Sequence, residues 1–279
     1  MKILVTGGSG FIGKTFVKKY RDKLDIVAPT HAQMDLTNAH EVQKLFSAHR
    51  FDAVVHLAGA GEQIAQSALE ADNLIMFKNI QYMSIVHGVK KLITVGEGVE
   101  FDRSRPIVDF SESMFGRSIP RDGYGLARYL INLLASKDKI TTVLRIFNVY
   151  GMGGGKRPIN KIVAAGARGK KIVIDRDRTV SAVAVDDVAR VIYEFLRGDY
   201  QKGDYNLVAG DKMSYTEIAK AVRRLVRRDG GDVEIVVKNP KPDLEYTADN
   251  GKLVSTLGVR LTSTATGVKN LYNNLVRNS

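Results

Sequence analysis

The amino-acid sequence predicts an α/β fold in which a doubly wound parallel sheet is followed by a smaller α/β lobe. Short apolar runs alternate with helical patterns from Lys2 to Phe147, a glycine-rich turn follows the first run, and the pattern becomes less regular after Gly151. This alternation is typical of parallel sheets, because each crossover between parallel strands needs a connecting segment, usually a helix. The 279 residues, 44% of them hydrophobic, are enough to bury a large core.

The first 150 residues supply the elements of the expected sheet. Strands are expected at residues 2–6, 24–28, 53–58, 91–95 and 141–147. Helices are expected at residues 11–20, 38–49, 71–88 and 124–136. The run at 53–58 is continuously apolar, as in a strand that is buried on both faces. Asn38 and Glu41 have the spacing of a capping box at the start of the second helix.

The second lobe is expected to comprise residues 151–279, after a glycine loop at 151–155. A strand at 181–185 and a helix at 186–196 have the pattern of the first domain, so we expect residues 180–200 to return to it. Ser214 and Glu217 form a second capping box before a helix at 218–226, and a strand is expected at 233–237. The sequence thus predicts domains at 1–150 and 151–279.

The composition excludes several classes of site. Without cysteine the chain has no disulfide, thiolate metal site or thiol nucleophile, and its five histidines lack the spacing of a metal site. The apolar runs are too short to cross a bilayer, and no apolar leader precedes the first strand. We therefore expect no metal, no membrane partner and a cytoplasmic location.

The net charge of +12 raises the question of an anionic partner. The basic residues are dispersed, apart from four arginines at helical spacing that are typical of a solvated helix face: Arg223, Arg224, Arg227 and Arg228. We therefore expect no nucleic-acid partner. Positive potential around a cleft also favours the capture of small anions such as dinucleotides and sugar diphosphates.

The first turn indicates a dinucleotide site. It reads TGGSGFIG at residues 6–13, so that Gly7, Gly10 and Gly13 recur every three residues between a strand and a helix. Positions without side chains let the backbone approach a pyrophosphate, which the amides at the helix start then bind. Phe11 and Ile12 lie in the same first helical turn. Residues 1–150 are therefore predicted to be a dinucleotide-binding Rossmann domain.

The end of the second strand favours NADP over NAD. A carboxylate would normally receive the adenosine ribose there, but residues 28–31 are Ala-Pro-Thr-His. Without that negative charge a 2′-phosphate is not repelled, and Lys14 and His31 are its candidate partners. Asp35 and Leu36 stand where the chain would cover adenine, although Asp35 is equally suited to turning the chain before the next helix.

A series of motifs resembles one known family along almost the whole chain. They are TGGSGFIG (6–13), MDLTN (34–38), DAVVHLAG (52–59), DNL (72–74), GVKKLITVG (88–96), RIFNVYG (145–151), VDDVAR (185–190) and LVSTLGV (253–259). The sequence is similar to the extended short-chain dehydrogenase/reductases, which include nucleotide-sugar epimerases, dehydratases and 4-keto reductases, and within them to the GDP-L-fucose synthases. The resemblance implies a nucleotide-sugar substrate, a substrate-binding lobe at 151–279 and a homodimer.

The resemblance also assigns binding residues. It implies that Ala58 and Gly59 line the cofactor, that Asn73 and Asn79 lie on the helix beside it, and that Asn148 contacts the sugar nucleotide. Simple structural roles remain open, because Asn73 suits a helix turn and Asn148 a strand end. Candidate partners of the substrate diphosphate, each equally suited to be a surface charge, are Arg157, Lys161, Arg178 and Arg190.

The expected catalytic pair departs from the family. The family's Tyr-x-x-x-Lys motif is matched by Tyr124 and Arg128, which are four residues apart and so share one helical face. A nearby cation lowers the pKa of a tyrosine, and we expect Arg128 to do so here. Arginine is larger than lysine and forked, so the exchange is not conservative.

Glu97 stands where the resemblance expects a catalytic serine or threonine. A carboxyl group donates a proton only when it is protonated. Three interpretations follow: Glu97 is itself a general acid or base, Thr94 or Ser104 provides the hydroxyl instead, or catalysis is lost. An exposed loop glutamate without a role is the simplest alternative.

Two functions remain open on this reading. The first is an NAD(P)-dependent reductase or epimerase/reductase acting on a nucleotide-diphospho-4-keto sugar, with Tyr124 as the acid/base residue. The second is a sensor or scaffold protein of the same fold that binds the dinucleotide without turnover. The changes at Glu97 and Arg128 support the second.

Overall fold

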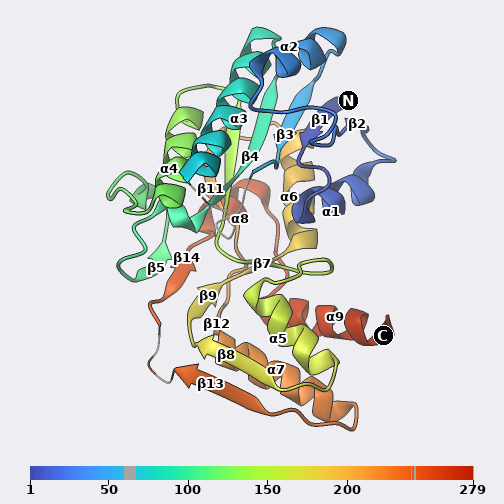
Figure 1. The fold of residues 1–279 in the computed structure, drawn as a ribbon, viewed down its shortest axis with the longest axis vertical. Coiled ribbons are helices and arrows are strands. Elements are labelled where there is room, and N and C mark those ends of the chain that lie inside the picture. Colours follow the sequence, from blue (N-terminus) through green and yellow to red (C-terminus); the bar gives the residue numbers. More distant parts are fainter. Residues whose placement is uncertain (60–66, 240, 242, 279) are drawn as a thin grey trace. The chain divides into compact units, whose positions relative to one another are not determined.

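The computed structural model describes residues 1–59, 67–239, 241 and 243–278, with the backbone alone at 67–70 (Figure 1). Its largest sheet has six strands in the order β11-β6-β4-β3-β1-β2. The pairs β11–β6, β4–β3, β3–β1 and β1–β2 are parallel. After β2 the chain crosses to the opposite side of β1 to form β3, which reverses the direction of winding. The predicted doubly wound α/β fold is confirmed.

The strands of this sheet follow the apolar runs of the sequence. They are β1 (Lys2–Thr6), β2 (Asp25–Val27), β3 (Ala53–His56), β4 (Lys91–Glu97), β6 (Thr141–Ile146) and β11 (Gly203–Asn206). All residues of β3 and β6 are buried, as expected for central strands of a parallel sheet. The core beneath includes Leu4, Val54 and Phe77, none of which is exposed.

Helices lie between the strands of this sheet along the chain. They are α1 (Phe11–Tyr20), α2 (Ala39–Ala48), α3 (Ser67–Val86), α4 (Gly123–Ala135) and α6 (Val185–Arg197). The Asn38 side chain caps α2 by accepting from the amides of His40 and Glu41. The predicted capping box is only half correct, because Glu41 Oε2 accepts from the amide of Asp35 rather than from that of Asn38. No helix in the described part of the chain has the length and apolarity that a membrane span requires.

The structure divides into two compact units. Unit 1 comprises Met1–Ser104, Glu112–Arg145 and Val188–Asn206, and unit 2 comprises Arg105–Ser111, Ile146–Asp187 and Leu207–Ser279. Residues 188–206 therefore group with the first half of the chain, while residues 105–111 and 180–187 group with the second. The boundary at 150 differs from this division and, as a boundary between functional domains, stays a prediction.

Unit 2 contains small sheets and helices. Its strands are β5 (Ile107–Phe110), β7 (Val149–Tyr150), β8 (Ile172–Arg176), β9 (Thr179–Ser181), β10 (Val183–Ala184), β12 (Lys212–Ser214), β13 (Ile235–Asn239) and β14 (Tyr246–Ala248). Its helices include α5 (Pro158–Ala167), α7 (Tyr215–Arg228), α8 (Gly251–Leu257) and α9 (Thr264–Arg277). The predicted capping box of Ser214 and Glu217 begins α7 and is complete. The core of this unit includes Ile162, Val222 and Val268.

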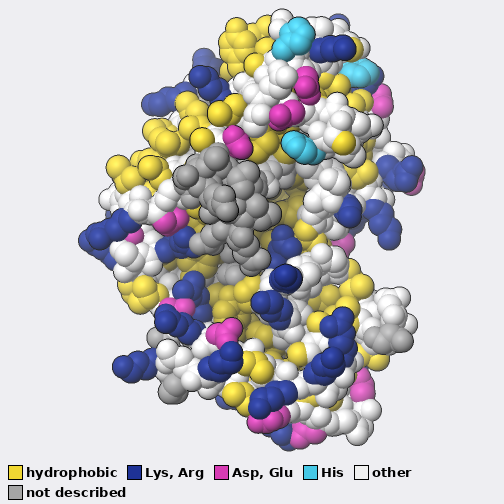
Figure 2. Space-filling model, in the orientation of Figure 1, with side chains coloured by type: hydrophobic (Ala, Val, Ile, Leu, Met, Phe, Trp, Pro, Cys, Tyr) yellow, Lys and Arg dark blue, Asp and Glu magenta, His cyan; other side chains and the backbone are white. Residues whose placement is uncertain are grey.

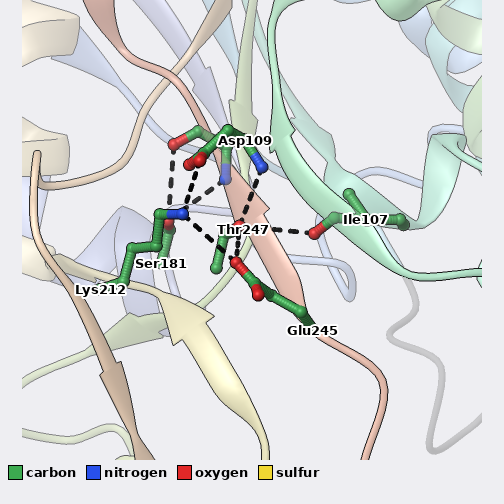
Figure 3. Close-up of polar contacts among 7 residues, drawn as sticks. Ile107, Asp109, Ser181, Lys212, Glu245 and Thr247 are labelled. Carbon is green, nitrogen blue, oxygen red and sulfur yellow. Dashed lines mark hydrogen bonds and ion pairs between the residues drawn. The ribbon is translucent and has the colours of Figure 1, made fainter.

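A polar network ties the edge strands of the sheet β12-β9-β14-β5 together (Figure 3). Lys212 Nζ lies 2.5 Å from Asp109 Oδ2 and 3.3 Å from Glu245 Oε1. The amide of Asp109 donates to Thr247 Oγ1 over 2.9 Å. Among the described residues Asp109 alone has a positive φ without being glycine, at 51°. The pairing of β5 with β14 shifts register at this point, so the network holds a local irregularity of the sheet.

Candidate active site

The glycine turn after β1 is packed more closely than any side chain would allow. Gly7 has a φ of +69°, and a Cβ on it would lie 2.5 Å from the amide nitrogen of Ala58. A Cβ on Gly13 would clash with the carbonyl oxygen of Gly7, and one on Gly10 would lie 3.2 Å from that atom. No described side chain caps the start of α1. The predicted glycines therefore form a tight cradle at the helix start, which suits a diphosphate.

The ends of β1 and β3 are joined beside this cradle. Thr6 Oγ1 lies 2.8 Å from His56 Nδ1, and the amide of Leu57 donates to the carbonyl of Thr6 over 3.1 Å. Burial, aided by the charge of Arg128, lowers the pKa of His56 to about 3. A neutral imidazole therefore helps to fix the chain at Ala58 and Gly59, where ligands bind in folds of this type.

The expected adenosine side of the site is a folded loop. Asp35 Oδ1 accepts from the amide of Thr37 over 2.9 Å and from its hydroxyl over 2.8 Å, and these bonds lower the pKa of Asp35. Asn79 Nδ2 donates to the carbonyls of Leu36 and Thr37 over 2.9 and 3.2 Å. The Asp35 side chain thus turns the chain. Leu36 is 7% exposed and packs in the core, whereas His31 is exposed. Contact of these residues with adenosine stays a prediction.

Three polar side chains meet where β4 and α4 carry the expected catalytic residues. The Tyr124 hydroxyl donates to Glu97 Oε1 over 2.6 Å. Arg128 Nη2 lies 3.1 Å from the same oxygen and 3.3 Å from the Tyr124 hydroxyl. Glu97 ends β4, and Tyr124 and Arg128 are one turn apart on α4. The structure therefore brings all three predicted catalytic residues into direct contact.

The pKa of Tyr124 is raised, not lowered as the sequence suggested. Tyr124 is 3% exposed, and its burial is the largest cause, followed by the negative charge of Glu97. Arg128 lowers the pKa of Tyr124 but does not outweigh these two effects. The expectation from the cation alone was wrong because it omitted burial and the facing carboxylate. Tyr124 is consequently held in its protonated form.

Arg128 also links the predicted catalytic residues to the end of β3. A Cβ on Gly59 would lie 2.9 Å from Arg128 Nη2 and 3.2 Å from Asn73 Oδ1. Asn73 is 2% exposed and comes from α3. Gly59, Asn73 and Arg128 are therefore neighbours. The larger guanidinium fits here because position 59 carries no side chain.

Thr94 and Ser104, the two residues that could provide a hydroxyl in place of Glu97, differ in their exposure and in their hydrogen bonds. Thr94 is 2% exposed, and its hydroxyl donates to the carbonyl of His56 on the neighbouring strand. Ser104 is exposed, and its amide donates to Asp102 Oδ1. The Tyr124 hydroxyl donates its hydrogen bond to Glu97 and to neither of them. Glu97 is therefore the one of these three residues that contacts Tyr124, and its role in catalysis stays a prediction.

Most of the predicted substrate residues belong to unit 2, namely Asn148, Arg157, Lys161 and Arg178, whereas Arg190 belongs to unit 1. Asn148 Nδ2 donates to the carbonyl of Ser181 over 3.3 Å, and the hydroxyl of Tyr215 donates to Asn148 Oδ1 over 3.4 Å. Arg178 Nε and Nη2 both donate to Asp243 Oδ2, over 3.0 and 2.6 Å. Arg178 and Tyr215 are also adjacent, because the amide of Tyr215 donates to the carbonyl of Arg178.

Tyr215 therefore joins two of the predicted substrate residues, although no motif in the sequence pointed to it. Burial is the largest effect on its phenol and raises the pKa of Tyr215 to about 12. Its position directly after the cap Ser214 was the only signal in the sequence. Arg157 Nη1 donates to the carbonyl of Gly154 and closes the glycine loop.

Comparison with known proteins places the chain in a family. The model of the NAD dependent epimerase/dehydratase family matches residues 3–207. The chain belongs to this family. Its relatives include a GDP-6-deoxy-D-talose 4-dehydrogenase of Aggregatibacter actinomycetemcomitans, 26% identical over 98% of each chain. A GDP-L-fucose synthase of Azorhizobium caulinodans is 24% identical over 82% of each.

Solved structures agree with the fold of an epimerase/dehydratase. A GDP-mannoheptose C4 reductase from Campylobacter jejuni with NADP bound has a TM-score of 0.82 at 20% identity, covering 99% of this chain and 98% of that one. The family and fold expected from the sequence are thus confirmed, and the expected nicotinamide dinucleotide agrees with the family's description. The roles of individual residues stay predictions.

Proposed function

We propose that the protein is a reductase or epimerase/reductase that uses NADP, in preference to NAD, and acts on a nucleotide-diphospho-4-keto sugar. One continuous set of contacts in unit 1 carries this proposal. Gly7 abuts Ala58, Gly59 abuts Arg128, and Arg128 contacts both Tyr124 and Glu97. A dinucleotide cradle and a proton-transfer group therefore share one edge of the sheet, as hydride transfer to a carbonyl requires.

The names of similar proteins support this substrate class. They are a GDP-6-deoxy-D-talose 4-dehydrogenase, a GDP-L-fucose synthase and a GDP-mannoheptose C4 reductase, and each name contains a GDP-sugar. We propose the same chemistry for this chain, at C4 of a nucleotide sugar. The cytoplasmic location expected from the sequence fits a chain without cysteine, since such a fold needs no oxidising compartment.

Tyr124 is proposed to protonate the substrate oxygen. When bound, the reduced nicotinamide supplies the hydride that reduces the sugar carbonyl. Because burial and Glu97 keep the phenol protonated, Tyr124 is prepared to donate a proton to the alkoxide oxygen that forms at C4. Arg128 stabilises the resulting tyrosinate, and Glu97 lies 2.6 Å from the phenol oxygen, close enough to exchange a proton with it.

In unit 2, Arg178 and Asn148 are proposed to bind the substrate diphosphate and sugar, with Arg157 near the glycine loop. Arg178 is now paired with Asp243, so a diphosphate would have to replace that carboxylate. Both anions suit the fork of a guanidinium. The pairing therefore agrees with an anion site and also with a purely structural ion pair, which only substrate binding distinguishes.

Purified protein mixed with NADPH and a panel of GDP-, dTDP-, CDP- and UDP-4-keto sugars tests the proposal. Loss of absorbance at 340 nm with at least one sugar is expected, and Tyr124→Phe should slow it by about 100-fold or more, the usual contribution of a general acid. No absorbance change with any sugar refutes the reductase. A Tyr124→Phe variant as active as the wild type refutes the role of the phenol.

A dinucleotide-binding sensor or scaffold is the second candidate. The hydroxyl of Tyr124 donates to Glu97, and an arginine replaces the family's lysine, so the catalytic pair is altered. This function predicts binding of NADP(H) without turnover, and no loss of biological function on Tyr124→Phe. Turnover of any 4-keto sugar excludes it.

We further propose a homodimer formed through α3 and α4. These helices pack against each other, and apolar side chains gather on the side of the molecule where they lie (Figure 2). Large exposed apolar residues of the pair are Ile75, Tyr82, Ile85, Val86, Leu126 and Leu133. Such a patch on a protein surface is typical of an interface. Light scattering should give the mass of a dimer, and a monomeric mass refutes this proposal.

A further inference from the structure

Glu100 is a buried carboxylate that holds the main chain of Glu97. It is 1% exposed and closes the short 3-10 helix η2 (Gly98–Glu100), which begins directly after Glu97. The amide of Glu97 donates to Glu100 Oε1 over 2.8 Å. Because the side chain of Glu97 contacts Tyr124, this hydrogen bond fixes the backbone from which the catalytic carboxylate projects.

The second oxygen of Glu100 is held from two other elements. Arg145 Nε donates to Glu100 Oε2 over 2.9 Å, and Asn132 Nδ2 donates to it over 2.6 Å. Arg145 is itself 0% exposed and donates to Asn206 Oδ1 over 3.0 Å and to Asp204 Oδ2 over 2.7 Å. The Glu100 carboxylate is therefore anchored by β6 and α4 and has little freedom to move.

Gly96 provides the space for this arrangement. A Cβ at Gly96 would clash with Glu100 Oε1 and would lie 2.7 Å from Val143 Cγ1. The carboxylate of Glu100 thus occupies the volume that a side chain at position 96 would need. Gly96, Glu97 and Glu100 together shape the turn after β4, while Arg145 holds it from β6.

A gain in stability alone is a weak explanation for burying the charges of Glu100 and Arg145 together. Desolvation of two buried charges opposes their attraction, so apolar replacements of a buried ion pair are often as stable. We propose that Glu100 and Arg145 are positioning residues, which fix the backbone of Glu97 so that its carboxylate meets the Tyr124 hydroxyl. This inference deepens the proposed function and rests on it for its kinetic consequences.

A positioning role of Glu100 and Arg145 predicts a change in the pKa of Tyr124 that a purely structural role does not predict. If Glu97 is displaced, Tyr124 loses the negative charge that is the second cause of its raised pKa, while Arg128 still acts in the opposite direction. The pKa of Tyr124 then falls. Since the proton donor is the neutral phenol, the alkaline limb of the pH–kcat profile moves to lower pH.

The test compares the double variant Glu100→Gln/Arg145→Met, which removes both charges of the Glu100–Arg145 pair, with the single variant Glu100→Gln. Arg223→Met removes an exposed arginine paired with Asp232 in unit 2 and serves as the control. We expect kcat to fall about 10- to 100-fold, as for a misplaced catalytic group, with KM for NADPH unchanged. The alkaline limb should move to lower pH in both Glu100 variants but not in the control.

Glu97→Gln decides whether the effect passes through Glu97. Added to the Glu100→Gln variant, it should cause little further shift of the limb, because both changes remove the same influence on Tyr124. The proposal is overturned if the shifts of the alkaline limb caused by Glu97→Gln and Glu100→Gln add in the combined variant. It is also overturned if a folded Glu100→Gln variant keeps the alkaline limb of the wild type. Carbon-13 NMR of the tyrosine Cζ atoms, with Tyr124 assigned from Tyr124→Phe, follows the same ionisation without turnover. A wild type without reductase activity thus refutes the proposed function, while the NMR titration still decides the positioning role.

Discussion

Replacing Gly7 by alanine should weaken dinucleotide binding through a backbone clash, and Gly88 offers a matched control. The two glycines have nearly equal φ angles, +69° and +67°. A Cβ at Gly7 would lie 2.5 Å from the amide nitrogen of Ala58 and 2.6 Å from the carbonyl carbon of Leu57, whereas no described heavy atom lies within 4 Å of one at Gly88. Comparing Gly7→Ala with Gly88→Ala therefore separates two losses in the free energy of unfolding. One comes from placing alanine in a left-handed backbone conformation, and the other comes from the clash of its Cβ with neighbouring atoms.

The expected magnitudes follow from these distances. An alanine in the left-handed region costs about 1–2 kcal/mol, which both variants incur. Ordinary contact needs about 3.5 Å, so Gly7→Ala must also separate β1 from the end of β3 by about 1 Å, and such overpacking costs about 1–3 kcal/mol more. We expect the free energy of unfolding to fall by about 2–4 kcal/mol in Gly7→Ala, against about 1 kcal/mol in Gly88→Ala because alanine also restricts the unfolded chain.

Urea unfolding and a fluorescence titration with NADPH measure both effects. The affinity for NADPH should drop more than about tenfold in Gly7→Ala, a change of 1.4 kcal/mol or more, and stay at the wild-type value in Gly88→Ala. Equal losses of stability in the two variants, with equal affinities for NADPH, would show that close approach at Gly7 is irrelevant to the cradle.

Three further predictions concern charges. The pKa of His56 is lowered to about 3 when folded and is ordinary when unfolded, so the unfolded chain binds the proton and stability should fall by about 1.4 kcal/mol per pH unit below pH 6.5. Urea midpoints of wild type and His56→Gln between pH 7 and pH 4 test this, and equal slopes contradict it. Arg128→Lys should lower kcat about tenfold, because one ammonium cannot reproduce the fork that contacts two side chains; an unchanged kcat in the 340 nm assay would exclude this. Lys212→Met should lower the free energy of unfolding by only about 0–1 kcal/mol, because Lys212 and Asp109 are partly exposed. A decrease of more than about 2 kcal/mol, measured at high salt, would contradict the assignment of Lys212 and Asp109 as a weak surface ion pair.

The sequence alone determined the fold class, the family and the position of the tight glycine turn between β1 and α1. These depend on local patterns: the alternation of apolar runs and helices, and the spacing of Gly7, Gly10 and Gly13, which acts within one strand, turn and helix. The pairing of Tyr124 with Arg128 was also predictable, because residues four apart on a helix share a face. The element ends shifted by a few residues, as for α3, which begins at Ser67 rather than at residue 71.

Only the tertiary structure decided the electrostatics of the site. It raised the pKa of Tyr124 by burying the phenol against Glu97, and it paired Arg178 with Asp243, 65 residues away. It also joined Glu100 to Arg145, 45 residues apart, next to the backbone of Glu97. A charge interacts with whatever lies within a few ångströms and with the loss of water around it, and the order of residues along a chain specifies neither.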